Sequence, residues 1–348
     1  MRHGLVLAAA LAFGSFASFP CSSQAVASDS LKIYFIDVEG GQATLFVTPS
    51  GQSMLVDTGW PGFNGRDAER IVAAAKAAGL SKIDYVLITH FHRDHVGGVP
   101  QLAERFPIGT FIDHGENREL ANQDTVQVWE TYEKLLQVGK YKHMVARPGD
   151  KLPITGMDVV VVSADGKVLA KPRPGAGGDN PACRGEQQYP ADTTENVRSL
   201  GFVATFGQLR ILDLGDLTRD KEMELMCPVN KLGKIDIYVV SHHGSEQSGT
   251  AALVHGIDPS VAIMDNGAEK GGSPGPWQVV KKSPHLEDLW QLHSAEGRGS
   301  YNVPGEFIAN AQGPDSGEYL RLTALPDGSF EIFNSRAKTT KKYHAKAH

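Results

Sequence analysis

The chain has 348 residues, of which 41% are hydrophobic and 21% are charged, as is usual for a globular protein with room for a large core. The length fits one large α/β domain or two smaller domains. The formal net charge of −6 argues against a basic nucleic-acid-binding domain, so we expect no stable nucleic-acid complex.

The first 27 residues are predicted to be a secretory signal peptide. A basic start at Arg2 precedes an apolar run over 5–19, and a small-residue cleavage pattern ends at Ala27. A lipoprotein anchor at Cys21 is the alternative, although the residues before it fit that motif poorly. No later segment is apolar for long enough to span a bilayer. We therefore expect a secreted or periplasmic protein that makes no membrane contact after cleavage and carries 33 basic and 40 acidic residues.

Two cysteines, Cys183 and Cys227, remain after this cleavage. In an oxidising compartment they could pair as a disulfide. They could equally stay as two separate thiols, one in a loop and one at a helix end. The sequence leaves both possibilities open.

Apolar runs with the period of strands alternate with helical segments along the mature chain. Strands are predicted at 31–38, 43–48, 53–56, 83–89, 109–113, 157–163, 200–206, 209–214, 235–240, 261–264, 319–324 and 330–333. Helices are predicted at 67–78, 100–106, 125–138, 218–226 and 285–293.

The order of these elements predicts two similar halves whose sheets pack inside and whose helices pack outside. We expect one domain over 28–335. A Gly- and Pro-rich segment at about 165–195 has no periodicity and is predicted to be a long surface loop beside the site. The last residues, 336–348, are basic and are predicted to form a flexible tail.

The segment His90-Phe91-His92-Arg93-Asp94-His95 places three imidazoles and one carboxylate within six residues, directly after a predicted buried strand. Side chains two apart on an extended chain share a face, so His90 and His92 should point the same way. The turn that follows returns Asp94 and His95 toward the same point. Imidazole nitrogen and carboxylate oxygen are ligands that zinc and similar ions prefer. We therefore predict a metal site here.

Three further strand ends carry an acid or an imidazole beside a glycine. They are Asp57 in Val56-Asp57-Thr58-Gly59, Asp216 in Gly215-Asp216, and His242 in Ser241-His242-His243-Gly244. Strand ends are where layered α/β proteins assemble their sites, so these residues should meet the histidine cluster.

With these motifs in this order, the chain resembles the metallo-β-lactamase superfamily, and most closely the C-terminal domain of ComEC-type DNA-uptake proteins. The finer match is carried by the segments 35–38, 41–43, 55–59, 89–98, 196–200, 212–216 and 241–245. The resemblance covers about 33–333. It implies an α/β fold of the four-layered αββα sandwich type and a metal-dependent hydrolase.

The resemblance also implies a ligand set for two divalent ions, with zinc favoured and manganese as the alternative. His90 and His92 would bind the first ion; Asp94, His95 and His242 would bind the second; and Asp216 would bridge them. His243 is the alternative to His242. Asp57 would accept a hydrogen bond from a histidine ligand or from a loop and so fix its position.

One position departs from the wider family, many of whose members place another histidine before the strand at 200–206. This chain has Asn196 there, as ComEC-type domains do, and an amide oxygen suits harder ions such as manganese. His114, at another predicted strand end, is the second candidate for that contact.

The expected reaction is hydrolysis by a metal-bound hydroxide, with Asp94 and Asp216 as catalytic carboxylates. A phosphodiester is the favoured substrate. Hydrolysis of a carbonyl substrate (β-lactam, lactone or thioester) is the alternative, and a non-catalytic binding module is a second alternative. The sequence does not determine the oligomeric state.

Overall fold

The computed structural model describes Met1 and residues 29–139, 141–296 and 301–346. Apart from Met1, the predicted signal peptide lies outside these residues. None of the helices among the described residues is long and apolar enough to cross a membrane.

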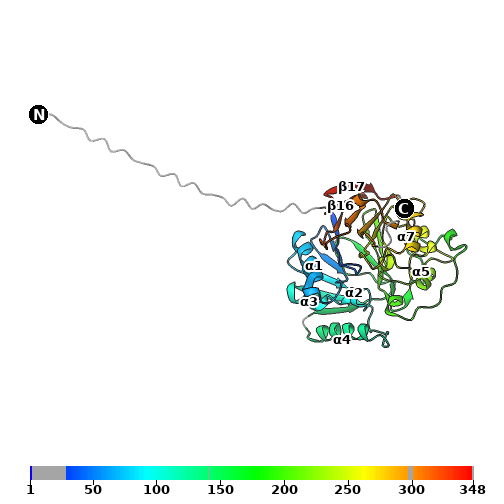
Figure 1. The fold of residues 1–348 in the computed structure, drawn as a ribbon, viewed down its shortest axis with the longest axis horizontal. Helices are drawn as coiled ribbons and strands as arrows, with labels where there is room; N and C mark the ends of the chain where they lie inside the picture. Colours follow the sequence, from blue (N-terminus) through cyan, green and yellow to red (C-terminus); the bar gives the residue numbers. More distant parts are fainter. Residues whose placement is uncertain (2–28, 140, 297–300, 347–348) are drawn as a thin grey trace.

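Two β-sheets form the centre of the molecule (Figure 1). Among the described residues the first sheet has nine strands, in the order β17 (Thr339–His344), β16 (Ser329–Asn334), β15 (Leu320–Ala324), β1 (Leu31–Phe35), β2 (Thr44–Val47), β3 (Ser53–Val56), β4 (Ile83–Leu87), β5 (Ile108–Asp113) and β6 (Lys142–Val145). The second has eight described strands, in the order β14 (Ile308–Asn310), β13 (Asp288–His293), β12 (Val261–Met264), β11 (Ile237–Val239), β10 (Leu209–Asp213), β9 (Gly201–Phe206), β7 (Asp158–Ala164) and β8 (Lys167–Val168).

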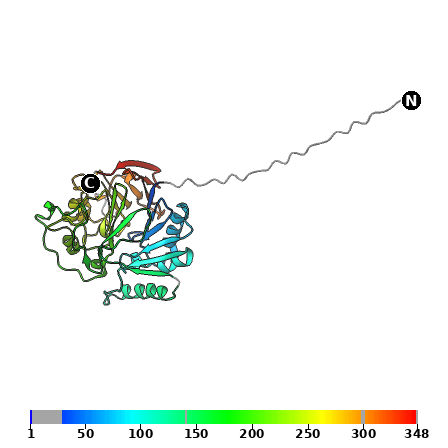
Figure 2. The same cartoon turned by 180° about the vertical axis from the view of Figure 1, so that it is seen from behind.

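Helices cover the outer face of each sheet (Figures 1 and 2). The helices of the first half are α1 (Arg66–Ala77), α2 (Arg93–Val96), α3 (Val99–Arg105) and α4 (Gln123–Gln137), and those of the second are α5 (Arg219–Met226), α6 (Ala251–Ile257) and α7 (Pro274–Lys281). Ile71 of α1 and Leu102 of α3 pack against the first sheet, whereas Leu253 of α6 and Val280 of α7 pack against the second. The fold is the expected αββα sandwich.

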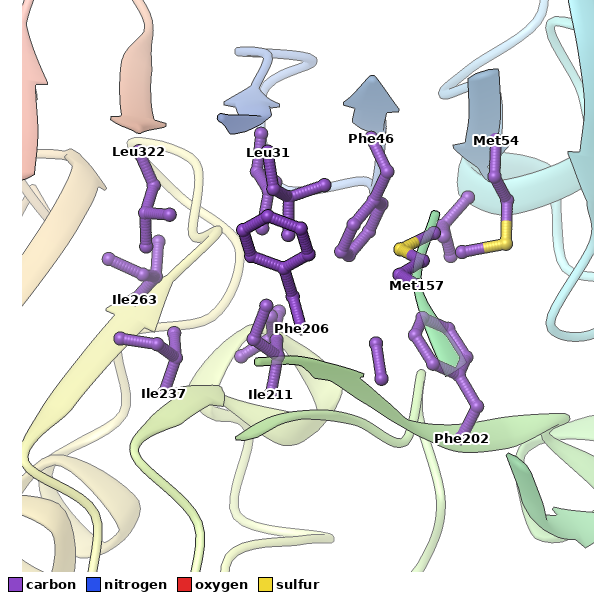
Figure 3. Close-up of a cluster of buried hydrophobic side chains, with 14 of the residues drawn as sticks. Leu31, Phe46, Met54, Met157, Phe202, Phe206, Ile211, Ile237, Ile263 and Leu322 are labelled. Atoms are coloured by element: carbon purple, nitrogen blue, oxygen red, sulfur yellow. The ribbon is translucent and has the colours of Figure 1, made fainter. Parts of the chain in front are cut away.

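The largest apolar core lies between the two sheets, where both inner faces exclude water. Figure 3 shows side chains from opposite sheets meeting there, such as Phe46 of β2 and Phe202 of β9, whose ring centroids are 6.0 Å apart. Alternate residues of the strands face this core or the outer helices, because successive side chains point to opposite faces. This double burial explains why central strands such as β11 and β12 are apolar along their whole length.

Both sheets contain a parallel block next to the centre of the molecule. Strands β3, β4, β5 and β6 pair in parallel in the first sheet, and β10, β11, β12, β13 and β14 do so in the second. The carboxyl ends of neighbouring parallel strands meet at one sheet edge, so loops from distant parts of the sequence come together there.

Two sequence-based predictions are wrong in this structure. Residues 285–293 are predicted as a helix on the outside of a sheet. They instead contain strand β13, which pairs in parallel with β12 inside the second sheet. The predicted flexible tail contains strand β17, which pairs with β16 over its full length. Its lysines mark an exposed edge strand, where charge blocks pairing with another chain, and its Tyr343 stacks on Phe330.

The Gly- and Pro-rich segment begins with strand β8 and is attached at its middle to the second half of the molecule. A short 3-10 helix, η2 (Pro181–Cys183), lies in it, and Cys183 forms a disulfide with Cys227 at the end of α5. The Asn180 side chain donates hydrogen bonds to the carbonyl oxygens of Met226 and Ala252. The sequence had left the pairing of the two cysteines open.

Candidate metal centre

Four loops that follow strand ends converge at the common edge of the two sheets. They follow β3, β4, β10 and β11 and carry the acids and imidazoles singled out in the sequence. The β10 loop approaches the β4 loop so closely that a Cβ on Gly215 would lie 2.9 Å from the Cβ of Thr89, and Gly215 has a φ of +53°. A glycine is needed there because other side chains would both clash and strain the backbone.

Four buried side chains, Asp94, His95, Asp216 and His243, point one ligand atom each toward a common point. All four atoms lie within 4.8 Å of one another. The Nε2 atom of His95 is 3.1 Å from Asp94 Oδ2, 3.3 Å from Asp216 Oδ1 and 3.3 Å from His243 Nε2. His243 Nε2 is 3.3 Å from each of the two carboxylate oxygens. We call these residues the four-ligand group.

The spacing within this group suits a small tetrahedral cation. Five of the six distances between the four atoms are 3.1–3.3 Å. A regular tetrahedron with edges of this length has its centre about 2.0 Å from each corner, which is the bond length of zinc to nitrogen and oxygen ligands. The Oδ1 atom of Asp216 is buried and has no hydrogen-bond partner among the described residues. A buried carboxylate oxygen of this kind is costly unless something positive satisfies it. The donor set therefore fits a divalent metal ion.

His243, and not His242, completes the four-ligand group. His242 instead places its Nε2 atom 3.2 Å from Asp216 Oδ2, the other oxygen of that carboxylate. Both histidines have a left-handed backbone, with φ of 55° and 54°, inside the 3-10 turn η4 (Ser241–Gly244). The sequence favours His242 because it follows the predicted strand closely, but the left-handed turn directs His243, the next residue, into the four-ligand group.

The two other imidazoles of the motif lie beside the four-ligand group. His90 Nε2 is 3.0 Å from His92 Nδ1 and 3.9 Å from Asp216 Oδ2. Asp216 thus has one oxygen toward the four-ligand group and the other toward His90 and His242. This is the arrangement required of a carboxylate that bridges two ions.

Carboxylates behind the imidazoles hold them in place. Asp57 Oδ2 is 2.7 Å from His95 Nδ1, and the same carboxylate accepts hydrogen bonds from the backbone and hydroxyl of Thr89. Glu119 Oε2 is 2.8 Å from His92 Nε2. Asp265 Oδ1 is 3.4 Å from His243 Nδ1, but neither atom makes a hydrogen bond among the described residues, so Asp265 is near this imidazole without being hydrogen-bonded to it. Carboxylates in this position fix the orientation of a ligand imidazole and increase its basicity.

Residues 36–180 match the sequence profile described as the Metallo-beta-lactamase superfamily. These residues, which include the His90–His95 motif, carry a metallo-β-lactamase superfamily domain. It is also 26% identical over 260 residues to Recombination protein 2 from Haemophilus influenzae, a ComEC-like protein, which confirms the finer resemblance. That alignment covers 74% of this chain and 26% of the relative, so the chain spans about a quarter of the relative's length.

Two solved structures are also similar. The metallo-beta-lactamase fold protein YhfI from Bacillus subtilis has a TM-score of 0.45 and 12% identity, with coverage of 75% of this chain and 95% of that one. The diiron beta-hydroxylase CmlA from Streptomyces venezuelae has a TM-score of 0.39 and 15% identity, with coverage of 74% of this chain and 47% of that one.

Metallo-β-lactamase superfamily proteins bind divalent metals, and the buried His and Asp side chains of this chain lie where such ions would be held. Burial disfavours the charge on Asp216, but the imidazoles of His242, His95 and His243 outweigh burial and hold the pKa of that carboxyl well below its usual range. Conversely, burial would lower the pKa of His243, and Asp216 raises it to about 10. Protons on the imidazoles thus balance the carboxylates, and a dication can replace them.

His114 does not lie in the four-ligand group. Its ring packs 4.6 Å from that of Phe91, and its Nε2 atom is 3.0 Å from Glu195 Oε2. Asn196 is buried, and its Oδ1 atom lacks a hydrogen-bond partner among the described residues. The backbone N–H of Glu195, the residue before it, donates to the Glu119 oxygen that contacts His92. This hydrogen bond connects the Asn196 turn to the His92 side of the candidate metal centre.

Sequence reasoning missed three polar residues of this site. Asp265 directly follows strand β12, so the strand-end pattern that singled out Asp57 and Asp216 was also available for it. Glu119 and Lys270 lie in loops with no recognisable motif, and Lys270 contacts Asp94 across 176 positions of sequence. Only the fold brings Glu119 to His92 and Lys270 to Asp94.

Proposed function

We propose that this chain is a hydrolase that uses two divalent metal ions, zinc or manganese, to cleave a phosphodiester. Asp94, His95 and His243 would hold one ion. His90 and His92 would hold the other, with Asn196 and His242 as candidates to complete it. Asp216 would bridge the two ions. The observation that carries this proposal is the convergence of four buried ligand atoms, one of them a carboxylate oxygen that makes no hydrogen bond within the described residues.

When bound, divalent ions supply Lewis acidity and lower the pKa of a coordinated water to about 7, which makes hydroxide available at neutral pH. The side chains of this protein prepare the site for that chemistry. Asp216 keeps its negative charge because three imidazoles surround it. The Nδ1 atom of His95 is hydrogen-bonded to Asp57, so the Nε2 atom of His95 is left to act as the ligand. Asp94, which also contacts the half-exposed Lys270, would orient the nucleophile.

Three features support a phosphodiester over a carbonyl substrate. The relative from Haemophilus influenzae is named as a recombination protein. The segment 241–245 and Asn196 match ComEC-type domains. An amide oxygen at Asn196 also suits the harder ions that commonly accompany phosphate substrates.

We further propose that the protein is exported after cleavage behind Ala27. The disulfide between Cys183 and Cys227 supports an oxidising compartment. Mass spectrometry of the protein recovered from the periplasm or medium tests this, and a mature chain that starts at Ser28 is expected. Recovery of the intact chain from the cytoplasm alone would contradict it.

The decisive experiment measures metal content and activity on the same preparation. Metal-loaded protein is assayed with bis-nitrophenyl phosphate, single-stranded DNA, nitrocefin and a lactone. Hydrolysis of the first should disappear on chelation and return with zinc or manganese. Preferential hydrolysis of nitrocefin or the lactone would favour the carbonyl alternative. Bound metal without turnover of any of the four would favour a binding module.

A further inference from the structure

The loop between β12 and α7 is seated directly on the metal centre. The backbone N–H groups of Gly272 and Ser273 donate to the carbonyl oxygens of His243 and Gly244, at 2.9 Å and 2.8 Å. A Cβ on Gly271 would lie 2.2 Å from the His243 carbonyl oxygen, and its φ of +76° also favours glycine. The backbone around Lys270 is therefore held at a fixed place relative to the four-ligand group.

From this loop the side chain of Lys270 reaches the ligands. Its ammonium contacts Asp94 Oδ2 and lies 5.2 Å from the centroid of the Trp60 ring. The Lys270 side chain is 35% exposed, whereas that of Asp94 is 8% exposed. Among the residues that the structure describes, no other lysine or arginine forms an ion pair with the four-ligand group. Lys270 thus joins the buried centre to the solvent.

The oxygen that Lys270 contacts is an oxygen that a metal ion would take. Asp94 Oδ2 is the atom that lies 3.1 Å from His95 Nε2 and 3.3 Å from His243 Nε2. A dication bound by these atoms would neutralise Asp94 and repel an ammonium a few ångströms away. The loop prevents Lys270 from leaving, and the face of Trp60 offers it a favourable position. The ammonium is then left at the mouth of the site without its carboxylate partner.

We infer that Lys270, positioned by Trp60, forms an anion subsite beside the metal centre that binds a non-reacting oxygen of the substrate's phosphate group. An ammonium next to a metal centre attracts anions and makes strong charge-assisted contacts with phosphate oxygens. The subsite selects anionic phosphate esters over neutral carbonyl compounds. The identity of the reacting group rests on the proposed function, whereas the presence of an anion subsite does not.

The test is the affinity of zinc-loaded protein for inorganic phosphate, measured by titration calorimetry at fixed ionic strength. Lys270→Met should weaken phosphate binding by about tenfold or more, because a charge-assisted contact is lost. Lys270→Arg should restore most of the affinity. Lys282→Met, which removes an exposed lysine after α7, is the matched control and should leave it unchanged. Zinc content and melting temperature should stay the same in all three variants.

Phosphate binding that is equal in Lys270→Met and the unchanged protein would overturn the subsite. So would a loss of zinc in Lys270→Met, because Lys270 would then act only through the ligand set. In the substrate panel, Lys270→Met should lower kcat/KM for bis-nitrophenyl phosphate much more than for a lactone. Phosphate binding that depends on Lys270 in a protein without hydrolytic activity would support the subsite while the proposed function fails. Diester hydrolysis with the same kcat/KM in Lys270→Met as in the unchanged protein would support the proposed function and overturn the subsite.

Discussion

Two clusters of histidine and carboxylate side chains in this protein have similar compositions but different surroundings. The four-ligand group is one, and Asp37, Glu39 and His293 form the other, with ligand atoms also within 4.8 Å of one another. In the second cluster His293 Nε2 is 2.8 Å from Asp37 Oδ1, and Arg70 pairs with Asp37 Oδ2 at 2.8 Å.

The difference lies in the hydrogen bonds that the carboxylate oxygens of each cluster accept. Asp37 uses both oxygens, since its Oδ1 also accepts from the backbone of Glu39 and its Oδ2 from Arg70. In the four-ligand group Asp216 Oδ1 lacks a hydrogen bond among the described residues, although two imidazole nitrogens lie 3.3 Å away. A cluster whose carboxylate oxygens are all hydrogen-bonded stabilises the packing of neighbouring strand ends. A cluster with a buried carboxylate oxygen that accepts no hydrogen bond, such as Asp216 Oδ1, is suited to bind a cation.

The largest effect is expected from Asp216→Asn, which removes the charge shared by both sides of the centre. Metal binding should be lost from at least one site, and diester hydrolysis should fall by about a thousandfold or more. Elemental analysis and steady-state assays check this. The matched control is Asp213→Asn, because burial raises the pKa of Asp213 to about 7 and a neutral side chain suits that position. Full metal content in Asp216→Asn would contradict the bridging role.

Asp37→Asn tests the other cluster. It leaves Arg70 and His293 without their buried partner, so the free energy of unfolding should fall by about 3 kcal/mol. Denaturant unfolding measures this loss. Metal affinity should not change, and a change would show that the two clusters are not distinct. Asp315→Asn, on the more exposed side of Arg70, should cost less than about 1 kcal/mol.

Glu119→Gln should weaken metal binding on the His92 side about tenfold to a hundredfold, because an amide holds the imidazole less firmly than a carboxylate does. Competition with a chromogenic chelator gives the affinity. Glu116→Gln changes an exposed carboxylate of the same loop and should have no effect. Equal metal affinities for the Glu119→Gln and Glu116→Gln variants would show that Glu119 does not stabilise the His92 side of the site.

The smallest effect is a pH dependence. The carboxylate of Asp216 raises the pKa of His243 to about 10 against the effect of burial, and Asp216 and Asp94 likewise raise the pKa of His95. In metal-free protein these protonated imidazoles contribute stability that is fully present below about pH 6.5 and is lost as pH rises toward about 10. Zinc must displace the same protons, so its affinity should rise over this window.

Thermal melts of metal-free protein and zinc titrations in buffers of different ionisation enthalpy measure these opposite slopes. His293 also has a raised pKa, because the hydrogen bond and charge of Asp37 outweigh the burial that would lower it. Asp37→Asn is therefore a control. It should change how the free energy of unfolding depends on pH, but not how the zinc affinity depends on pH. A zinc affinity that is flat with pH would mean that the imidazoles are neutral before zinc binds.

The local pattern of the sequence was sufficient for much of the fold. Apolar runs predicted most strands, and the helix predicted at 125–138 corresponds to α4, since their periodicities are set by backbone geometry alone. The prediction for 285–293 failed because its apolar residues at 286, 289 and 290 have the spacing of a helix, whereas residues 288–293 pair as strand β13. Strand β17 was missed because its exposed edge reads as a charged tail.

By itself, the sequence determined the six-residue motif, the strand-end carboxylates and the superfamily, because side chains a few residues apart are brought together by the chain itself. The tertiary structure decided which histidine of His242 and His243 joins Asp94, since that depends on a left-handed turn. It also decided that Glu119, Asp265 and Lys270 belong to the site. Their contacts with His92, His243 and Asp94 span from 22 to 176 positions, and only the packing of two sheets can bring the longest of these together.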